Sequence, residues 1–208
     1  KILSRIGRIV RFSQLAIKLH SVESIYSRTE ITKQLSDFYL ALASENLKEV
    51  RVASYLMLGR IVPAYKSLEF NLSSKLVIRA LARAAASLDE SQQEDLFGNA
   101  VAQDQHVGAV EQRFKEVGDL GDLAQDILEE KEAYPELSIQ EVFDQLEEIA
   151  RFSGSGSQEQ KLSALTDLLH RVTPLSAKYI VRIIVGKLRL GFSEKTLFDA
   201  LSWARTGS

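Results

Sequence analysis

The sequence of 208 residues contains no cysteine, and it has only three prolines, one tryptophan and one methionine. Without cysteine the protein can form neither a disulfide nor a thiolate metal site, which suits a reducing compartment. It also lacks an apolar run of about eighteen residues, so we expect no membrane-spanning helix. Residues 1–14 are too polar for the apolar segment of a signal peptide. The sequence therefore predicts no association with a membrane.

Positive charge is scarce in the middle of the chain. Residues 84–150 hold 3 Lys and Arg against 18 Asp and Glu, although the net charge of the whole chain is only −2. Residues 1–83 hold 14 Lys and Arg against 6 Asp and Glu, and residues 151–208 hold 9 against 4. Such segregation is typical of a polyanion-binding face. An acidic helical surface that only aids solubility is the alternative, and charge alone does not separate the two.

Apolar residues recur at helical spacing along most of the chain, and no alternating pattern is long enough for a strand. The sequence therefore predicts an all-α fold, a compact bundle of about ten to twelve helices. The expected helices cover residues 12–19, 31–42, 52–59, 76–86, 96–103, 110–117, 120–132, 139–152, 162–170 and 178–185, with a further amphipathic run after Ser193.

Three pairs of segments indicate an internal repeat. SRTEITKQLSDFYLA from Ser27 resembles SQEQKLSALTDLLHR from Ser157, YLMLGRI (55–61) resembles RIIVGKL (182–188), and FNLSSKLVIRALA (70–82) resembles LGFSEKTLFDALS (190–202). The period is longer than the roughly 20 to 50 residues of solenoid repeats. We interpret it as a duplicated multi-helix unit with halves 27–83 and 157–205 and an acidic insert, 84–150. Chance similarity between Leu- and Ala-rich helices is the alternative.

Glycine and serine precede one expected helix start, where GSGS (154–157) is followed by Gln158 and, one turn on, by Lys161. A helix N-terminus has free N–H groups and partial positive charge, and small residues let a phosphate approach it. A flexible connector is the alternative.

In GKLRLG (186–191), Leu188 and Leu190 can anchor a turn while Lys187 and Arg189 point outward to neighbouring phosphates. The two flanking glycines permit a tight turn and a close partner surface. Here the alternative is a helix end with solvated charges.

Catalytic and metal-binding patterns are missing. His20, His106 and His170 lie far apart, without the spacing of a metal site. Neither GxxxxGK[ST] nor GxSxG occurs. The sequence therefore offers no constellation for catalysis or metal binding within these residues.

Several motifs in sequence order resemble the N-terminal DNA-binding domain of ATP-dependent DNA ligases. They are SRTE (27–30), LGRIVPAY (58–65), LSSKLVIRALA (72–82), EVGDLGDLA (116–124), FSGSGSQEQK (152–161) and IVGKLRLGFSEKTLFDALS (184–202). Together they define a ligase-type domain over residues 11–205. Residues 1–10 have no match, and we interpret them as an extension or a cloning remnant.

The resemblance implies a helical domain with approximate twofold symmetry that binds nicked duplex DNA through its backbone and minor groove, independently of sequence. It also implies that the domain is a monomer that acts in DNA replication, repair and recombination. The short loops favour a prokaryotic source, hence the cytoplasm and its nucleoid, whereas a eukaryotic source would imply the nucleus. The DNA contacts implied are Ser27, Arg28, Gly59, Arg60, Gly118, Gly121, Ser153, Gly154, Ser155, Gly156, Ser157, Lys161, Gly186, Lys187, Arg189 and Gly191.

For the parent enzyme the resemblance implies ATP and Mg²⁺, and a clamp completed by an adenylylation domain and an OB domain of the same chain. The lysine nucleophile of that family stands in Lys-x-Asp-Gly, a tetrapeptide absent here. The chain ends about where the adenylylation domain would follow. We therefore expect an isolated domain that needs no cofactor and is inactive alone. The alternative is an α-helical interaction scaffold whose acidic middle recruits a basic protein, which would not require cations in glycine loops.

Overall fold

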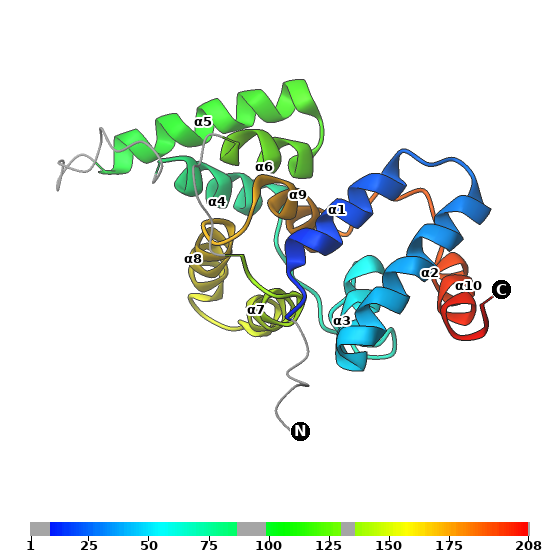
Figure 1. Ribbon diagram of the computed structural model, residues 1–208. Helices are drawn as coiled ribbons and strands as arrows, with labels where there is room; N and C mark the ends of the chain where they lie inside the picture. Colours follow the sequence, from blue (N-terminus) through cyan, green and yellow to red (C-terminus); the bar gives the residue numbers. More distant parts are fainter. Residues whose placement is uncertain (1–8, 87–98, 130–135, 208) are drawn as a thin grey trace.

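A computed structural model describes residues 9–86, 99–129 and 136–207 (Figure 1). Within these ranges the protein has ten α-helices and no strand beyond one isolated bridge, which confirms the all-α prediction. The same residues contain no helix that is both long and apolar enough to cross a membrane. The helices are α1 (Phe12–Glu23), α2 (Arg28–Glu45), α3 (Leu47–Met57), α4 (Ser74–Ala86), α5 (Asn99–Val117), α6 (Leu120–Leu128), α7 (Ile139–Arg151), α8 (Ser157–Leu169), α9 (Pro174–Ile184) and α10 (Glu194–Thr206).

Side-chain caps explain where several helices begin. The Ser27 hydroxyl accepts the Glu30 N–H at 3.4 Å before α2, and Asp119 accepts the Asp122 N–H at 2.9 Å before α6. Ser138 forms a reciprocal capping box with Glu141 before α7. Each cap satisfies an N–H group that has no partner inside its helix, so these starts follow from local sequence.

Two predicted helix boundaries differ from the structure. The apolar periodicity predicts separate helices over 96–103 and 110–117, but α5 runs without interruption over Asn99–Val117. The polar residues between the two apolar runs weaken the periodicity without breaking the backbone, and residues 96–98 lie outside the described part. Helix α6 ends at Leu128, and the predicted continuation over 130–132 also lies outside the described part.

The helices share one hydrophobic core, with α9 near its centre. Tyr179, Ile180 and Val181 on three successive positions of α9 are fully buried, so this helix is covered on several sides. In Figure 1, α4, α5, α6 and α8 lie on one side of the molecule and α2, α3 and α10 on the other, with α1 extending between them. Helix α10 packs against α2, and α4 packs against α8, so the last helix of each predicted half lies on the other half.

The ends of α3 and α9 have matching backbone geometry. Gly59 and Gly186 both adopt φ = +66°, a left-handed conformation that favours glycine. The Arg60 N–H donates to the Tyr55 carbonyl at 2.9 Å, and the Lys187 N–H donates to the Arg182 carbonyl at 2.9 Å. The starts of α1 and α7 also face each other, because Arg11 and Ser138 form the isolated antiparallel bridge.

Candidate nucleic-acid interface

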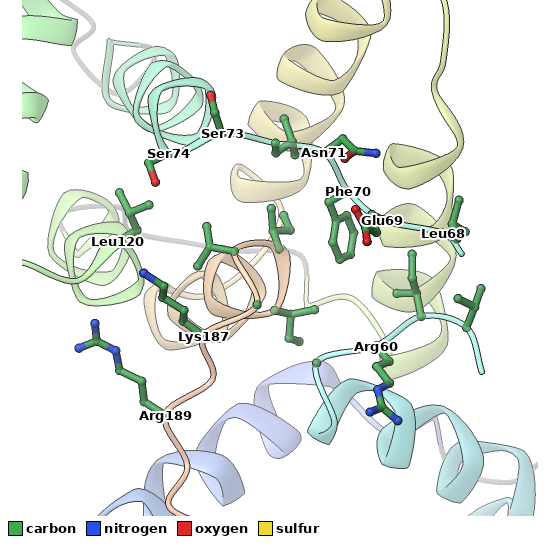
Figure 2. A pocket seen from close by; sticks show the side chains of 18 of the residues that line it. Arg60, Leu68, Glu69, Phe70, Asn71, Ser73, Ser74, Leu120, Lys187 and Arg189 are labelled. Carbon is green, nitrogen blue, oxygen red and sulfur yellow. The ribbon is translucent and has the colours of Figure 1, made fainter. Parts of the chain in front are cut away.

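Three of the predicted contact loops meet around one open hollow of about 910 Å³. The segment after α3 contributes Gly59 and Arg60, the turn before α6 contributes Gly118, and the loop after α9 contributes Gly186, Lys187 and Arg189. Figure 2 shows Lys187 and Arg189 extending from their loop to the same side, toward Leu120 at the start of α6. Loops far apart in the sequence are thus brought to one surface.

The start of α4 also lines this hollow, which the sequence analysis did not predict. Ser73 and Ser74 stand at its edge, immediately before and at the first residue of the helix (Figure 2). Asn71 adopts φ = +49°, so the chain turns sharply before the helix begins. A helix N-terminus attracts anions through its free N–H groups and its dipole. The motif LSSKL contains the signal for this position, a serine pair at a helix start.

The loop that follows α9 separates apolar from basic side chains. Leu190 is buried and Leu188 is half-buried, whereas Lys187 and Arg189 are exposed. A Cβ atom on Gly59 would lie only 3.3 Å from Leu188 Cδ1, so the two glycine loops pack closely against each other. The leucines fix the loop while its cations remain available to a ligand.

Arg189 is held by a buried carboxylate. Its Nε lies 3.2 Å from Asp119 Oδ2, and Asp119 is 6% exposed. The other oxygen of Asp119 accepts the Asp122 N–H and the Arg182 Nε–H, the latter at 3.1 Å. Burial alone would raise the pKa of Asp119, but these hydrogen bonds and the two arginine charges outweigh it and lower that pKa. Asp119 is therefore ionised at neutral pH.

A network of charges beneath this loop joins α1, α6 and α9. Arg182, which is 3% exposed, pairs with Glu23 at 2.9 Å and with Asp122 at 3.2 Å. Lys178 lies 2.9 Å from Asp122, and the Tyr179 hydroxyl donates to Glu23 at 2.6 Å. Burial and the Glu23 carboxylate raise the pKa of the Tyr179 hydroxyl, so it remains a donor. The exposed loop thus packs on a network in which each buried positive charge is paired with a carboxylate.

Two other predicted arginines form ion pairs with α10. Arg28 lies 2.6 Å from Asp199, and Arg60 lies 3.4 Å from Glu194. All four side chains are at least 40% exposed, so each pair contributes little stability, about 0–1 kcal/mol. Their cations can accept another anionic partner at small cost.

The Gly/Ser loop before α8 lies beside α4 and away from the first hollow. Gly154 and Gly156 have φ of +84° and +81°, and they line a smaller hollow of about 460 Å³ with Arg79. Gly156, not a serine, occupies the cap position of α8, and Ser157 is its first residue. Ser153 and Ser155 are exposed in the same loop, as is Gly191 in the loop before α10. Arg79 cannot be predicted as part of this site from the sequence, because only packing brings α4 to this loop.

Two predicted contact residues are buried instead. Lys161 is 5% exposed, and its Nζ donates to the Phe70 carbonyl at 2.6 Å. Gly121 is buried, and a Cβ atom there would lie 2.7 Å from the Lys178 carbonyl oxygen. Contrary to the sequence prediction, neither residue presents a surface to a ligand. Lys161 holds the segment before α4, and Gly121 lets α6 approach α9.

Known proteins are similar to this chain over almost its whole length. A family model described as "DNA ligase N terminus" matches residues 11–202. "DNA ligase 1" of Methanosarcina acetivorans is 37% identical over 199 residues, which is 96% of this chain and 30% of that protein. A "Probable DNA ligase" of Dictyoglomus turgidum is 36% identical over 194 residues, 93% of this chain and 29% of that protein. Another of Aquifex aeolicus is 36% identical over 191 residues, 90% and 29% respectively. The chain thus spans about 30% of the length of these curated relatives.

Proposed function

This chain belongs to the DNA ligase N-terminal family, as its sequence motifs predict, and we propose that it binds duplex DNA, nicked or intact, without sequence preference. The observation that carries the proposal is the hollow at which two glycine loops with left-handed φ, the cations Lys187 and Arg189, and the start of α4 come together. Free N–H groups at a helix start and exposed cations both bind phosphate, and the glycines between them present no side chain that could read a base. The sugar–phosphate backbone is the ligand that fits them.

The arrangement suggests how backbone contact is made. Gly186 has no side chain to keep a partner at a distance, whereas Gly59 makes room for Leu188, and both glycines follow helices that are anchored in the core. Lys187 and Arg189 supply charge beside them, and the N–H groups at the start of α4 supply hydrogen-bond donors. A shallow groove of the duplex can therefore lie across these loops while the phosphates of its strands meet the cations.

We also infer that the two halves are related by an approximate twofold axis. Gly59 and Gly186 end their helices with matching hydrogen bonds, and α10 packs on α2 as α4 packs on α8. Arg11 and Ser138, paired in the antiparallel bridge, each precede the first helix of such a half, α1 and α7. The proposed halves thus extend to α1–α4 and α7–α10, with α5 and α6 between them. Paired loops suit a duplex, because its strands are themselves related by twofold axes.

For the whole protein we propose an ATP-dependent DNA ligase that seals nicks in replication, repair and recombination. Such an enzyme would take AMP from ATP with the help of Mg²⁺ in a separate adenylylation domain, and an OB domain would complete the clamp around the duplex. This chain would contribute binding, because it contains no Lys-x-Asp-Gly nucleophile. The similarity to DNA ligases along about 30% of their length supports that division of labour.

The test is the salt dependence of duplex binding by the double variant Lys187→Ala/Arg189→Ala. Each neutralised phosphate contact contributes about −0.9 to the slope of log K against log salt, so we expect the slope to flatten by about two units. The affinity should fall equally for unrelated sequences, since phosphate contacts carry no base information. Titration of labelled duplexes at several salt concentrations measures both quantities.

The matched control is Lys48→Ala/Arg51→Ala, which removes the same charge from exposed positions at the other end of α3. Its slope should remain that of the parent protein. If both double variants bind with parental affinity at every salt concentration, or if both flatten the slope equally, the proposed site is wrong.

A further inference from the structure

We infer that Asp119 is a positioning residue for DNA binding, which holds the Arg189 guanidinium so that its outer edge faces the hollow. This inference rests on the proposed function. Asp119 stands at the cap position of α6, within the segment GDLG, and is buried beneath the loop that carries Arg189. Asp119 would not contact DNA itself but would orient the Arg189 side chain that does.

The contacts of Asp119 divide between its two oxygens. Oδ1 accepts the Asp122 N–H at 2.9 Å and the Arg182 Nε–H at 3.1 Å, and so belongs to the protein interior. Oδ2 lies 3.2 Å from Arg189 Nε. Because Asp119 takes only the Nε edge of this guanidinium, the two Nη groups are left for a phosphate, which a planar guanidinium binds with two parallel hydrogen bonds. In the described part of the chain no other ion pair engages Arg189.

The backbone at Arg189 gives a second argument. Its φ is +54°, a left-handed conformation that is unfavourable for an L residue and that glycine would adopt freely. The glycines on either side, Gly186 and Gly191, also have positive φ. An arginine at this position lowers the stability of the protein relative to glycine. In return, the left-handed backbone directs the arginine side chain toward the hollow. Asp119 fixes that direction at the far end.

A carboxylate beneath a polyanion-binding site has two opposing effects on the affinity for DNA. As a charge alone, Asp119 repels phosphate, so its neutralisation would strengthen DNA binding. As a positioning group, it keeps Arg189 extended toward the hollow, so its neutralisation would weaken binding. The burial of Asp119 and its pairing with two arginines reduce the repulsion that reaches the surface. We therefore expect the positioning effect to be the larger one.

The experiment uses Asp119→Asn in the full chain. Asparagine caps a helix about as well as aspartate, so the start of α6 is preserved while the charge on Arg189 loses its partner. We expect duplex affinity to fall several-fold at low salt and the salt slope to flatten by about 0.9, as if the Arg189 contact were lost. In an Arg189→Ala background, Asp119→Asn should have no further effect on DNA binding, because the two residues act as one unit.

Asp122→Asn is the matched control. It removes the same charge from the same network, in which Asp122 contacts Lys178 and Arg182 but not Arg189. It should lower stability and leave the DNA salt slope unchanged. Arg189→Lys tests the geometry of the guanidinium with Asp119 itself left in place. It keeps the charge but loses the fork, so we expect weaker binding than in the parent protein.

The outcomes separate the two proposals. If Arg189→Ala does not weaken binding, the proposed DNA contact at this loop fails. If Arg189→Ala weakens binding while Asp119→Asn leaves it unchanged or strengthens it, only the positioning role fails. The same conclusion follows if Asp119→Asn weakens binding equally with and without Arg189, or if Arg189→Lys binds as tightly as the parent. Should Asp119→Asn not fold, the Arg189→Lys result decides the inference.

Discussion

At the scale of single residues, the use of a cation depends on whether its charge is already engaged inside the protein. The Lys161 ammonium is turned inward and donates to the Phe70 carbonyl, four residues before α4 begins at the hollow. Arg182 is likewise buried and forms ion pairs with Glu23 and Asp119. Lys187, by contrast, is exposed on a loop fixed by its leucines. An exposed cation can exchange water and counterions for phosphate, whereas a buried and paired cation cannot.

Lys161→Met therefore should affect stability and not the ionic part of DNA binding. Methionine keeps the apolar stem but removes the donor, so the Phe70 carbonyl loses its partner at a cost of about 1–3 kcal/mol. Urea unfolding measures this loss, and titration with duplex DNA should give the parental salt slope. The exposed Lys48→Met is the control, with a change in unfolding free energy within about 0.5 kcal/mol. A slope flattened by about one unit in Lys161→Met would show that the lysine reaches DNA after all.

At the scale of elements, the position of the loops depends on how closely α6 and α9 approach. Gly121 lies at their contact, where a Cβ atom would come within 2.6 Å of Arg182 Cγ and 2.7 Å of the Lys178 carbonyl oxygen. The backbone oxygen cannot move aside without moving α9. Because Asp119 caps α6 and α9 leads into the loop with Arg189, this contact sets the distance between Asp119 and Arg189.

Gly121→Ala should consequently destabilise the protein by about 1–3 kcal/mol, the usual cost of forcing extra volume into a packed site. Gly108→Ala is the control, since that glycine lies inside α5 with open space around a Cβ atom. It should raise stability by about 0.5–1 kcal/mol through helix propensity alone. Thermal and urea unfolding of the two variants measure the contrast. Equal effects of the same sign would mean that the α6–α9 contact does not depend on Gly121.

Local sequence predicts elements better than it predicts their neighbours. The apolar periodicity alone places most helices within a few residues of the structure, and the caps Ser27, Asp119 and Ser138 account for where three of them begin. The periodicity failed in α5, where polar residues separate two apolar runs although the helix continues through them. The segment 71–74 and Arg79 escaped prediction for another reason. They belong to the candidate site only because α4 packs beside loops that are remote in sequence.

At the scale of the whole molecule, the two proposed halves are not independent bodies. Helix α10 of the second half packs on α2 of the first, and α4 of the first packs on α8 of the second. The bridge between Arg11 and Ser138 ties the starts of both halves together. A loop on either half therefore depends on helices from both. Because each proposed half packs its last helix on the other half, we expect the protein to unfold as one cooperative unit. A simple tandem repeat would unfold as two units.

Leu197→Ala tests this cooperativity. Leu197 of α10 is 1% exposed, so its truncation should lower the unfolding free energy by about 2–5 kcal/mol. Trp203, the only tryptophan of the chain, lies in α10 and reports on that helix by fluorescence, whereas circular dichroism reports on all helices. If α10 is part of a single unit, both signals should shift to lower urea together, as two-state unfolding requires.

Phe198→Ala on the same helix is the matched control for this variant. Phe198 is 57% exposed, so its removal should change stability by no more than about 0.5 kcal/mol. A fluorescence transition that moves to lower urea while the circular dichroism splits into two steps would show that α10 unfolds apart from the rest. The exchanged packing would then be too weak to join the halves, and the loops at the hollow could move relative to each other. Coincident transitions, in contrast, mean that one folding event sets the distance between the Gly59 and Gly186 loops, so the proposed DNA site is formed by folding alone.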